Sequence, residues 1–465
     1  RQLFVFPEQF FIAFIVYRVI RLITRSVTKG VLTLILLTHH VFYPDYITGY
    51  GINTILGDVK LVNRIMLYLK ICIAGFAFLT AFGMTRIFRD QKDNSIQGFF
   101  RVVVKRLAKL ELAVVIVYVL AVLYRCLVAR QSLADLYMTE QQSIPMMLLY
   151  MCLDMVGLAH YMKTPMINMT WWYLSYVILL IAAMPFIYKA YEKFRYLLLP
   201  IGCLLPYALT DSDASFLALL PAVWLGTAFS YENWFEKLRE SRKKSNIAQR
   251  LLVSIGLIFL GYFMNTYVHG AYCYIVIPVI PYLAYEYLSY IPVARFWLKY
   301  IGKHSMNIFL THTFIYFYYY PDFIYSFRST WYVLPVFAAV SLALSIMIEV
   351  IKKLCLPGEA AARIFNLFFP ISVPLLIVCT VYATHQQAFQ PIIANDFLNH
   401  FNHNGSGIFA FFALLYRPME TAESLYPLYG SVGQIAKTCI LLVLYTILFY
   451  CISLQDKYAQ EDDEP

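Results

Sequence analysis

Residues 26–43 read Ser26-Val-Thr-Lys-Gly-Val-Leu-Thr-Leu-Ile-Leu-Leu-Thr-His-His-Val-Phe-Tyr43, an apolar stretch with one lysine near its start and two histidines near its end. Lys29 and His40 are eleven residues apart. In a helix, eleven steps of about 100° return to within ~20° of the same face, about 16 Å further along the axis, whereas His39 points about a quarter-turn away. Ionisable groups are costly in hydrocarbon, so this stripe predicts a membrane helix that carries a functional site.

The composition predicts an all-α, polytopic membrane helix bundle. Hydrophobic residues make up 61% and charged residues 14% of the 465. The mean hydropathy is +0.63, well beyond the values of soluble domains. Tyr and Phe dominate an aromatic content of 17%, which suits the interface belts and the dense packing of such a bundle.

Charge and cysteine content do not point to another class of protein. The net charge of +10 does not predict nucleic-acid binding, because the basic residues fall in short segments between apolar runs. The nine cysteines lie mostly inside apolar segments, without CxxC pairs or metal-ligand spacing. We therefore predict small core residues at these positions, with no disulfide and no metal site.

Ten apolar stretches are long enough to cross roughly 30 Å of hydrocarbon, and two more follow in the C-terminal part. The ten lie near residues 26–44, 61–84, 109–128, 172–190, 196–211, 215–230, 250–268, 271–288, 304–321 and 331–351, and the other two near 367–383 and 434–454. We predict three parts: an interfacial amphipathic helix over 1–25, a ten-span domain over 26–353, and residues 354–465 with two spans, an outer loop and an acidic tail.

The distribution of basic residues predicts that both termini are cytoplasmic. With the N-terminus inside, the segment Arg101–Lys109 and the cluster Arg239–Lys244 fall on the cytoplasmic side, as the positive-inside rule requires. The apolar segment over about 144–160 is broken by Asp154 and Gly157, and a crossing there would invert everything that follows. We expect it to be a re-entrant or interfacial piece on the outer side.

Four side chains besides those of the first span are candidates for a site. Arg106 and Lys109 share a helix face. Together with Lys29 they form either a cationic mouth for a phosphorylated ligand or ordinary positive-inside anchors. Trp172, at the start of the fourth span, is either an interface anchor or a ligand platform. His312, in the ninth span, is either a packed core residue or faces a cavity.

Five motifs in order resemble the acyltransferase 3 family of integral membrane acyltransferases, over roughly residues 26–353. The predicted ten-span, both-ends-inside topology is also the one that the family uses. The family's signature of a basic residue, ten positions and then histidine selects His40 over His39. The motifs are Lys29-x10-His40, Phe78-Leu-Thr-Ala-Phe-Gly83, Arg106-x-x-Lys109, Trp172-Tyr-Leu-Ser175 and Gly302-Lys-His-Ser-Met-Asn-Ile-Phe-Leu-Thr-His312.

The resemblance implies an O-acyltransferase of the plasma (inner) membrane that modifies polysaccharides or glycolipids of the cell envelope. The donor would be acetyl-coenzyme A, or another acyl-coenzyme A, arriving from the cytoplasm, and no metal would be needed. The acceptor would be a hydroxyl of a glycan or lipid-linked saccharide on the other side of the membrane. The resemblance does not predict the oligomeric state.

The resemblance also implies roles for the candidate side chains. Lys29, Arg106 and Lys109 would bind the donor phosphates, and Trp172 is placed with them as a donor-binding residue. The family has Arg-x-x-Arg where this chain has Lys109, and lysine lacks the bidentate fork of arginine. Donor binding is therefore a weaker expectation for Lys109 than for Arg106.

The catalytic group would be an imidazole. His40 would act as general base on the acceptor hydroxyl, or would form a transient acyl-histidine. His39 or His312 would orient His40 or polarise the thioester carbonyl. Many family members carry a glutamate shortly after the tryptophan of the fourth span, but this chain has Tyr176 and Val177 there, so no carboxylate is expected from that helix.

Two other classes of function fit the same pattern. Buried cations and histidines also suit a transporter or flippase for an anionic or glycolipid substrate, although the sequence shows no inverted repeat. A non-catalytic receptor on the same bundle is the third reading. For an acyltransferase, we expect the outer loop over about 384–433 to help select the acceptor.

Overall fold

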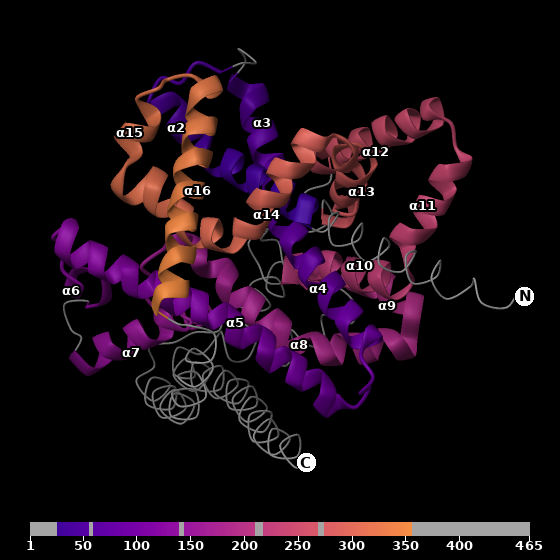
Figure 1. Cartoon of the computed structure of the whole chain (residues 1–465), viewed down its shortest axis with the longest axis horizontal. Helices are drawn as coiled ribbons and strands as arrows, with labels where there is room; N and C mark the ends of the chain where they lie inside the picture. The colour runs from indigo at the N-terminus through magenta and orange to yellow at the C-terminus, as the bar shows by residue number, and fades with distance from the viewer. Residues whose placement is uncertain (1–25, 55–58, 139–143, 210–216, 268–273, 356–465) are drawn as a thin grey trace, which may run out of the picture. The chain divides into compact units, whose positions relative to one another are not determined.

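The computed structural model describes residues 26–54, 59–138, 144–209, 217–267 and 274–355 (Figure 1). These residues form helices and turns with no strand among them, and one isolated bridge joins Asn53 to Ser329. The predicted all-α fold is thereby confirmed for these ranges. The predicted N-terminal amphipathic helix, the outer loop near 384–433 and the two C-terminal spans lie outside the described residues.

The chain divides into two compact units, and helices α4 and α16 each continue from one unit into the other. The first unit comprises Arg1–Leu79, Trp234–His269 and Cys273–Met347, and the second comprises Thr80–Asn233, Gly270–Tyr272 and Ile348–Pro465.

The first unit contains the predicted first and ninth spans. Its described elements are a helix over 26–41, α2 (Pro44–Gly49), α3 (Val59–Leu69), the start of α4 (Cys72–Asp90), α11 (Trp234–Lys244), α12 (Ile247–Tyr267), α13 (Val279–Glu286), a 3₁₀ turn (Leu288–Tyr290), α14 (Pro292–Thr313), a π-helical turn (Phe314–Tyr319), α15 (Pro321–Tyr325) and most of α16 (Thr330–Cys355).

The second unit contains the predicted third to sixth spans. Its described elements are the rest of α4, α5 (Ile96–Leu123), a π-helical turn (Tyr124–Val128), α6 (Ala134–Tyr137), α7 (Ile144–Met155), a 3₁₀ turn (Met169–Trp171), α8 (Trp172–Phe194), a 3₁₀ turn (Arg195–Leu197), α9 (Leu198–Leu209), a 3₁₀ turn (Leu217–Leu219) and α10 (Leu220–Tyr231).

Four helical stretches of the described chain are long and apolar enough to cross a membrane: Lys60–Asp90, Ile96–Val128, Met169–Cys203 and Thr330–Lys352. They support an integral membrane protein, while the count of ten spans stays a prediction. Helix α7 has 12 residues and is about 18 Å long, less than the roughly 30 Å of hydrocarbon, so it is too short to cross alone.

Two helices begin well before the apolar stretches that predicted them. Helix α5 starts at Ile96 and α14 at Pro292, rather than near 109 and 304. Arg101 and Arg106, which precede the predicted third span, therefore lie on α5. Arginine and lysine are good helix formers, so a helix continues through a basic segment that hydropathy excludes from a span.

A capped turn sets the start of α5. The Ser95 hydroxyl accepts the Gly98 N–H (3.0 Å), as an N-cap residue does. The Asp93 carboxylate accepts the Ser95 N–H (3.0 Å) and pairs with Arg101 (3.1 Å). Hydrogen bonds from Ser95, with a smaller contribution from the Arg101 charge, lower the pKa of Asp93.

The predicted second span, near 61–84, is two helices in the structure. Helix α3 ends at Leu69 and α4 begins at Cys72. Between them the backbone N–H groups of Lys70 and Ile71 donate to the carbonyls three residues earlier (3.2 and 3.1 Å). An unbroken α-helix would instead pair the Lys70 N–H with the carbonyl of Met66, so the break releases that carbonyl for another donor.

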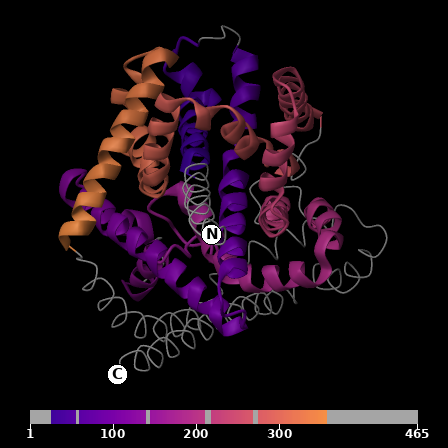
Figure 2. The same ribbon diagram turned by 45° about the vertical axis from the view of Figure 1, so that its right-hand side comes forward.

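Two glycines allow the helix over 26–41 to pack closely against α14. A Cβ on Gly30 would lie 2.0 Å from the Leu298 carbonyl oxygen, and one on Gly302 would lie 2.1 Å from that of Ser26. Small residues at such crossings let helix backbones approach each other. Figure 2 shows these neighbouring helices within the first unit.

The contacts between these two helices also give their relative direction. Gly30 meets Leu298 near the start of both helices, and the ring of His40 meets that of His312 near their ends. The helices therefore run in the same direction. Parallel spans require an odd number of crossings between them, a condition that the predicted first and ninth of ten spans meet, because seven spans lie between them.

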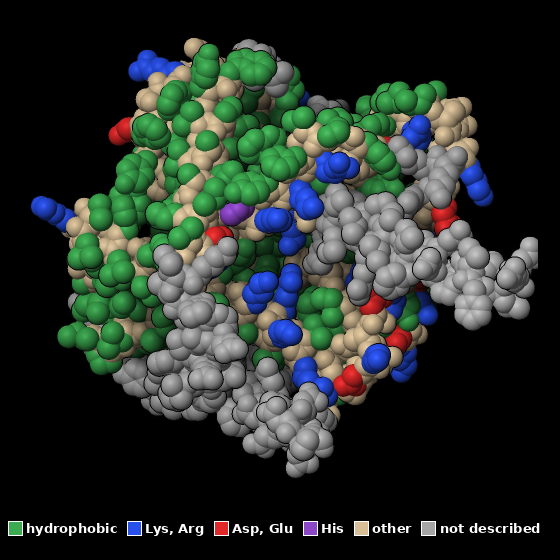
Figure 3. All heavy atoms as spheres, viewed as in Figure 1, with side chains coloured by type: hydrophobic (Ala, Val, Ile, Leu, Met, Phe, Trp, Pro, Cys, Tyr) green, Lys and Arg blue, Asp and Glu red, His purple; other side chains and the backbone are tan. Residues whose placement is uncertain are grey.

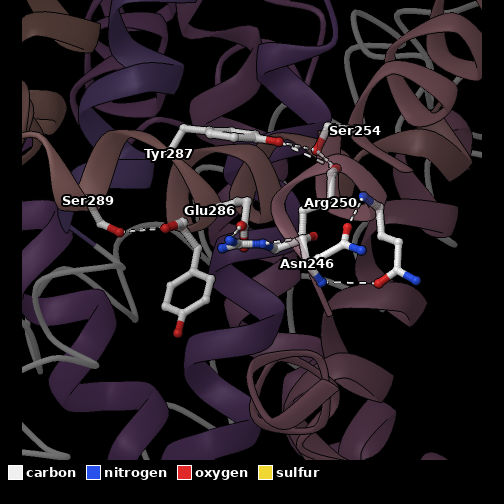
Figure 4. Close-up of polar contacts among 8 residues, drawn as sticks. Asn246, Arg250, Ser254, Glu286, Tyr287 and Ser289 are labelled. Carbon is white, nitrogen blue, oxygen red and sulfur yellow. Dashed lines mark hydrogen bonds and ion pairs between the residues drawn. The ribbon is translucent and has the colours of Figure 1, made fainter. Parts of the chain in front are cut away.

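A polar network joins α12 to α13 (Figure 4). The Arg250 guanidinium pairs with the carboxylate of Glu286 at 3.2 Å, and Glu286 is only 4% exposed. The Ser254 hydroxyl lies 2.7 Å from that of Tyr287 and donates to the Arg250 carbonyl (2.8 Å). A buried carboxylate requires such compensation, because an unpaired charge inside a protein is strongly destabilising.

The same network begins at a reciprocal N-cap of α12. The Asn246 N–H donates to the Gln249 side chain (3.1 Å), and the Gln249 N–H donates to the Asn246 side chain (2.8 Å). This capping box satisfies two backbone donors at the helix start and so sets where α12 begins.

A buried carboxylate organises part of the second unit. Asp154 on α7 is 1% exposed and accepts hydrogen bonds from the Tyr137 hydroxyl (2.5 Å) and the Ile167 N–H (2.6 Å). The Ser175 hydroxyl of α8 donates to the Gly157 carbonyl (2.6 Å). These bonds fix the segment between α7 and α8. Asp154, the polar residue that interrupts the apolar segment, therefore has hydrogen-bond partners that give it a structural role.

Hydrophobic side chains cover the surface over α15 and α16 (Figure 3). Phe323 is 52% exposed, Trp331 69% and Tyr332 64%. Large apolar side chains at this exposure suit contact with lipid rather than with water.

Candidate active site

Three histidines of the first unit lie within contact of one another. The ring centroids of His39 and His40 are 4.9 Å apart, and those of His40 and His312 are 5.0 Å apart. His39 is 6% exposed, His312 is fully buried and His40 is half-buried. His40 is therefore the central ring of the cluster and the one most open to a substrate.

The hydrogen bonds of His312 determine which ring nitrogen carries its proton. Nδ1 of His312 lies 3.1 Å from the carbonyl oxygen of Ile308 and 2.8 Å from that of Phe309. Carbonyl oxygens only accept, so Nδ1 carries the hydrogen, and in the neutral ring Nε2 keeps its lone pair. His312 is thus both a packed core residue and a member of the cluster.

His39 is held by the break between α3 and α4. Its Nδ1 donates to the Met66 carbonyl oxygen at 2.6 Å, the carbonyl that the break releases. The neutral His39 ring therefore also keeps its lone pair on Nε2. One backbone irregularity thus fixes the rotamer and the tautomer of the ring next to His40.

Tyr316 is a member of the cluster that the sequence did not single out. Its hydroxyl lies 3.3 Å from Nδ1 of His40, and the two ring centroids are 6.0 Å apart. Tyr316 is 4% exposed and lies in the π-helical turn after α14, with its ring edge-on to that of Phe337. The sequence could have indicated Tyr316 through its position four residues after His312, because residues at that spacing share a helix face.

Lys29 lies on the same helix as His40, near the opposite end. The helix is continuous over residues 26–41, so the predicted offset of about 16 Å between the two side-chain positions applies. Lys29 is half-buried and follows Thr28, which is buried. The structure thus places a cation and an imidazole at the two ends of one continuous helix.

The other candidate donor-binding residues belong to the second unit. Arg106 and Lys109 lie on α5, where Arg106 is half-buried and Lys109 is exposed. Trp172 begins α8, with its ring 6.1 Å from that of His160. The structure brings the three histidines together, whereas donor binding by Arg106, Lys109 and Trp172 stays a prediction.

Lys70, at the break between α3 and α4, is a second residue that the sequence analysis passed over. It lies inside the predicted 61–84 span, where an ionisable residue is by itself a signal of function. The mean hydropathy of this span does not reveal Lys70, because apolar residues flank it on both sides.

Taken together, the cluster offers proton acceptors rather than a metal site. Within the described ranges, no three His, Cys, Asp or Glu side chains are arranged to hold a metal ion. The Nε2 atoms of His39 and His312 have lone pairs in the neutral rings, and both rings contact the ring of His40. Such an arrangement suits removal of a proton from a substrate hydroxyl.

A comparison with protein families agrees with this arrangement. The family model described as "Acyltransferase domain", of the acyltransferase 3 type, matches residues 25–350, well over half of the chain. The chain belongs to this family of membrane acyltransferases, and the resemblance drawn from the five motifs is confirmed. No curated protein and no solved structure matches the chain.

Proposed function

We propose that the protein transfers an acyl group, acetyl in the first instance, from cytoplasmic acyl-coenzyme A to a hydroxyl of an extracytoplasmic glycan or lipid-linked saccharide. Membership of the acyltransferase family supports acyl transfer. The observation that carries the mechanism is the contact of His40 with His312 and Tyr316 at one end of a helix whose other end holds Lys29. The proposal places the protein in the plasma (inner) membrane with both termini in the cytoplasm.

In this proposal His40 removes the proton from the acceptor hydroxyl. For Nε2 of His40 to accept that proton, Nδ1 must carry a hydrogen and donate it to the Tyr316 oxygen, 3.3 Å away. Tyr316 is then a positioning residue that holds the reactive tautomer, as the third group of a catalytic triad does. His39 and His312 pack around His40 and limit its motion.

The donor is held by cations in this proposal. Lys29, Arg106 and Lys109 bind the phosphates of coenzyme A, since charge-assisted bonds to phosphate are among the strongest that side chains make. Trp172 contributes an aromatic surface to the donor.

Transfer of label tests the function directly. We expect membranes containing the protein, incubated with [¹⁴C]acetyl-coenzyme A, to incorporate donor-dependent label into a glycan or lipid fraction, and His40→Ala membranes to incorporate none above background. Uptake of substrate into vesicles without covalent label would instead show a transporter, and absence of both would leave a binding protein.

Arg106→Met is expected to raise the KM for acetyl-coenzyme A about 10-fold, with kcat nearly unchanged, because it removes a phosphate contact that is the same before and during the reaction. Lys105→Met is the matched control, since Lys105 is the exposed neighbour on α5. The measurement is steady-state acetyl transfer with varied donor. Equal KM values for the two variants would remove Arg106 from the donor site.

A further inference from the structure

Lys70 lies within an apolar segment. It is six residues beyond Arg64 in the apolar stretch Lys60–Asp90, or about 9 Å along a helix axis. Apolar residues continue on its other side, so we place it inside the hydrocarbon layer of roughly 30 Å, nearer to one face than to the other. Lysines at the ends of a span extend their ammonium to the interface, but a lysine inside the hydrocarbon is costly unless it faces a polar site.

The described residues provide no anion for this charge. Lys70 is half-buried, and its ammonium makes no hydrogen bond or ion pair with any residue of the ranges that the structure describes. Its backbone N–H bonds to the Leu67 carbonyl in the break between α3 and α4. A cation inside an apolar segment, for which none of the described residues supplies a counter-ion, suits a site whose anion comes from the substrate.

The position of Lys70 places its charge beside the histidine cluster. Met66, whose carbonyl binds His39, lies in the last turn of α3, and Lys70 directly follows that helix. The positive charge of Lys70 is close enough to act on the His39 ring, which in turn contacts His40. Lys70 is therefore near the end of the first helix that holds the imidazoles, rather than near Lys29.

We propose that Lys70 is a catalytic residue whose ammonium binds the oxyanion that forms on the thioester carbonyl during acyl transfer. This inference rests on the proposed function. The acceptor oxygen bonds to the carbonyl carbon, its proton passes to His40, and the electron pair of the C=O bond moves onto the oxygen, which Lys70 stabilises. When the intermediate collapses, the C–S bond breaks, and the coenzyme A thiolate leaves and takes the proton from His40. A donor aimed at such an oxyanion is typically worth 10²- to 10³-fold in rate.

Lys70→Gln is expected to lower kcat for acetyl transfer about 10²- to 10³-fold, with the KM for acetyl-coenzyme A within about 3-fold of wild type. Lys70→Arg keeps the charge and should retain more activity than Lys70→Gln. Chloroacetyl-coenzyme A, whose oxyanion is stabilised by its own chlorine, should reduce the deficit of Lys70→Gln. Arg64→Gln is the matched control, because Arg64 is an exposed cation on α3 and the same charge is lost.

The results distinguish failure of the proposed acyl transfer from failure of the oxyanion role of Lys70. If the wild-type protein transfers no label, the proposed function fails, whatever Lys70 does. If the wild-type protein is active and Lys70→Gln matches Arg64→Gln in kcat, the oxyanion role is overturned. A rise in KM for donor or acceptor with unchanged kcat would overturn it as well, since that marks binding of a ground-state anion. Thermal unfolding in detergent shows whether each variant is folded, and Lys70→Arg provides the test if Lys70→Gln is not.

Discussion

His40→Ala is expected to lower kcat/KM for acyl transfer about 10²- to 10⁴-fold, the contribution typical of a positioned general base. The loss should fall on kcat, because the imidazole takes the proton only as the acceptor oxygen attacks. The measurement is transfer of labelled acetyl groups by purified protein in detergent or nanodiscs, with the KM for the donor determined in parallel.

The control for His40→Ala is Thr38→Ala on the same helix. Among the described residues, the Thr38 hydroxyl bonds only to the Leu34 carbonyl one turn earlier (2.8 Å), so its loss should leave both folding and activity close to wild type. His39→Ala tests the contribution of the neighbouring imidazole separately from that of His40. The His39 ring is held by Met66 rather than by Tyr316. Full activity of His40→Ala with His39 intact would remove the proposed base.

Gly30→Ala is expected to be the most destabilising small substitution in the first unit. The new Cβ would lie 2.0 Å from the carbonyl oxygen of Leu298 and 2.8 Å from its Cα, which are backbone atoms that no rotamer change can move. Overpacking usually costs about 1–3 kcal/mol, and a clash with backbone belongs at or above the upper end of that range. The two parallel helices must separate to relieve it, which also separates His40 from His312.

Gly256→Ala is the matched control for this effect. It is also a glycine inside a helix, α12, but a Cβ there meets no atom within 4 Å. Alanine is favoured over glycine in a helix by about 1 kcal/mol, so this variant should unfold at or above the wild-type temperature. Thermal unfolding in detergent compares the two proteins, and equal unfolding temperatures for Gly30→Ala and Gly256→Ala would contradict the close crossing.

The same crossing predicts how activity and stability are linked. A lost contact between His40 and His312 should lower acyl transfer even at temperatures where Gly30→Ala remains folded. A variant that is destabilised but fully active below its unfolding temperature would show that the helix spacing does not control the histidine cluster.

Much of the site follows from local sequence. Lys29 and His40 share a stripe because of the helical period alone, and the described helix over 26–41 is continuous, as that stripe requires. His312 was a candidate because a histidine stands out in an apolar run, and the structure places its ring 5.0 Å from that of His40. The family assignment likewise followed from short motifs, whose order along the chain needs no tertiary information.

The predicted helix bounds were wrong where the apolar content of a segment and its tendency to form a helix differ. Helix α5 extends through Arg101 and Arg106 because basic residues favour helix as well as apolar ones do, although hydropathy stops the span at residue 109. The predicted second span is broken at Lys70, because the hydrogen bond from His39 to the Met66 carbonyl compensates the lost helical bond. Neither signal is contained in the mean hydropathy of a segment.

By itself the sequence determined the class of protein, its all-α fold and the stripe of Lys29 and His40, because hydropathy and helical period depend only on nearby residues. Only the tertiary structure decided which groups surround His40. Met66 is 27 residues from the histidine that it binds, and Tyr316 is 276 residues from His40. Such partners meet only when whole helices pack against one another, and that packing is a property of the folded chain.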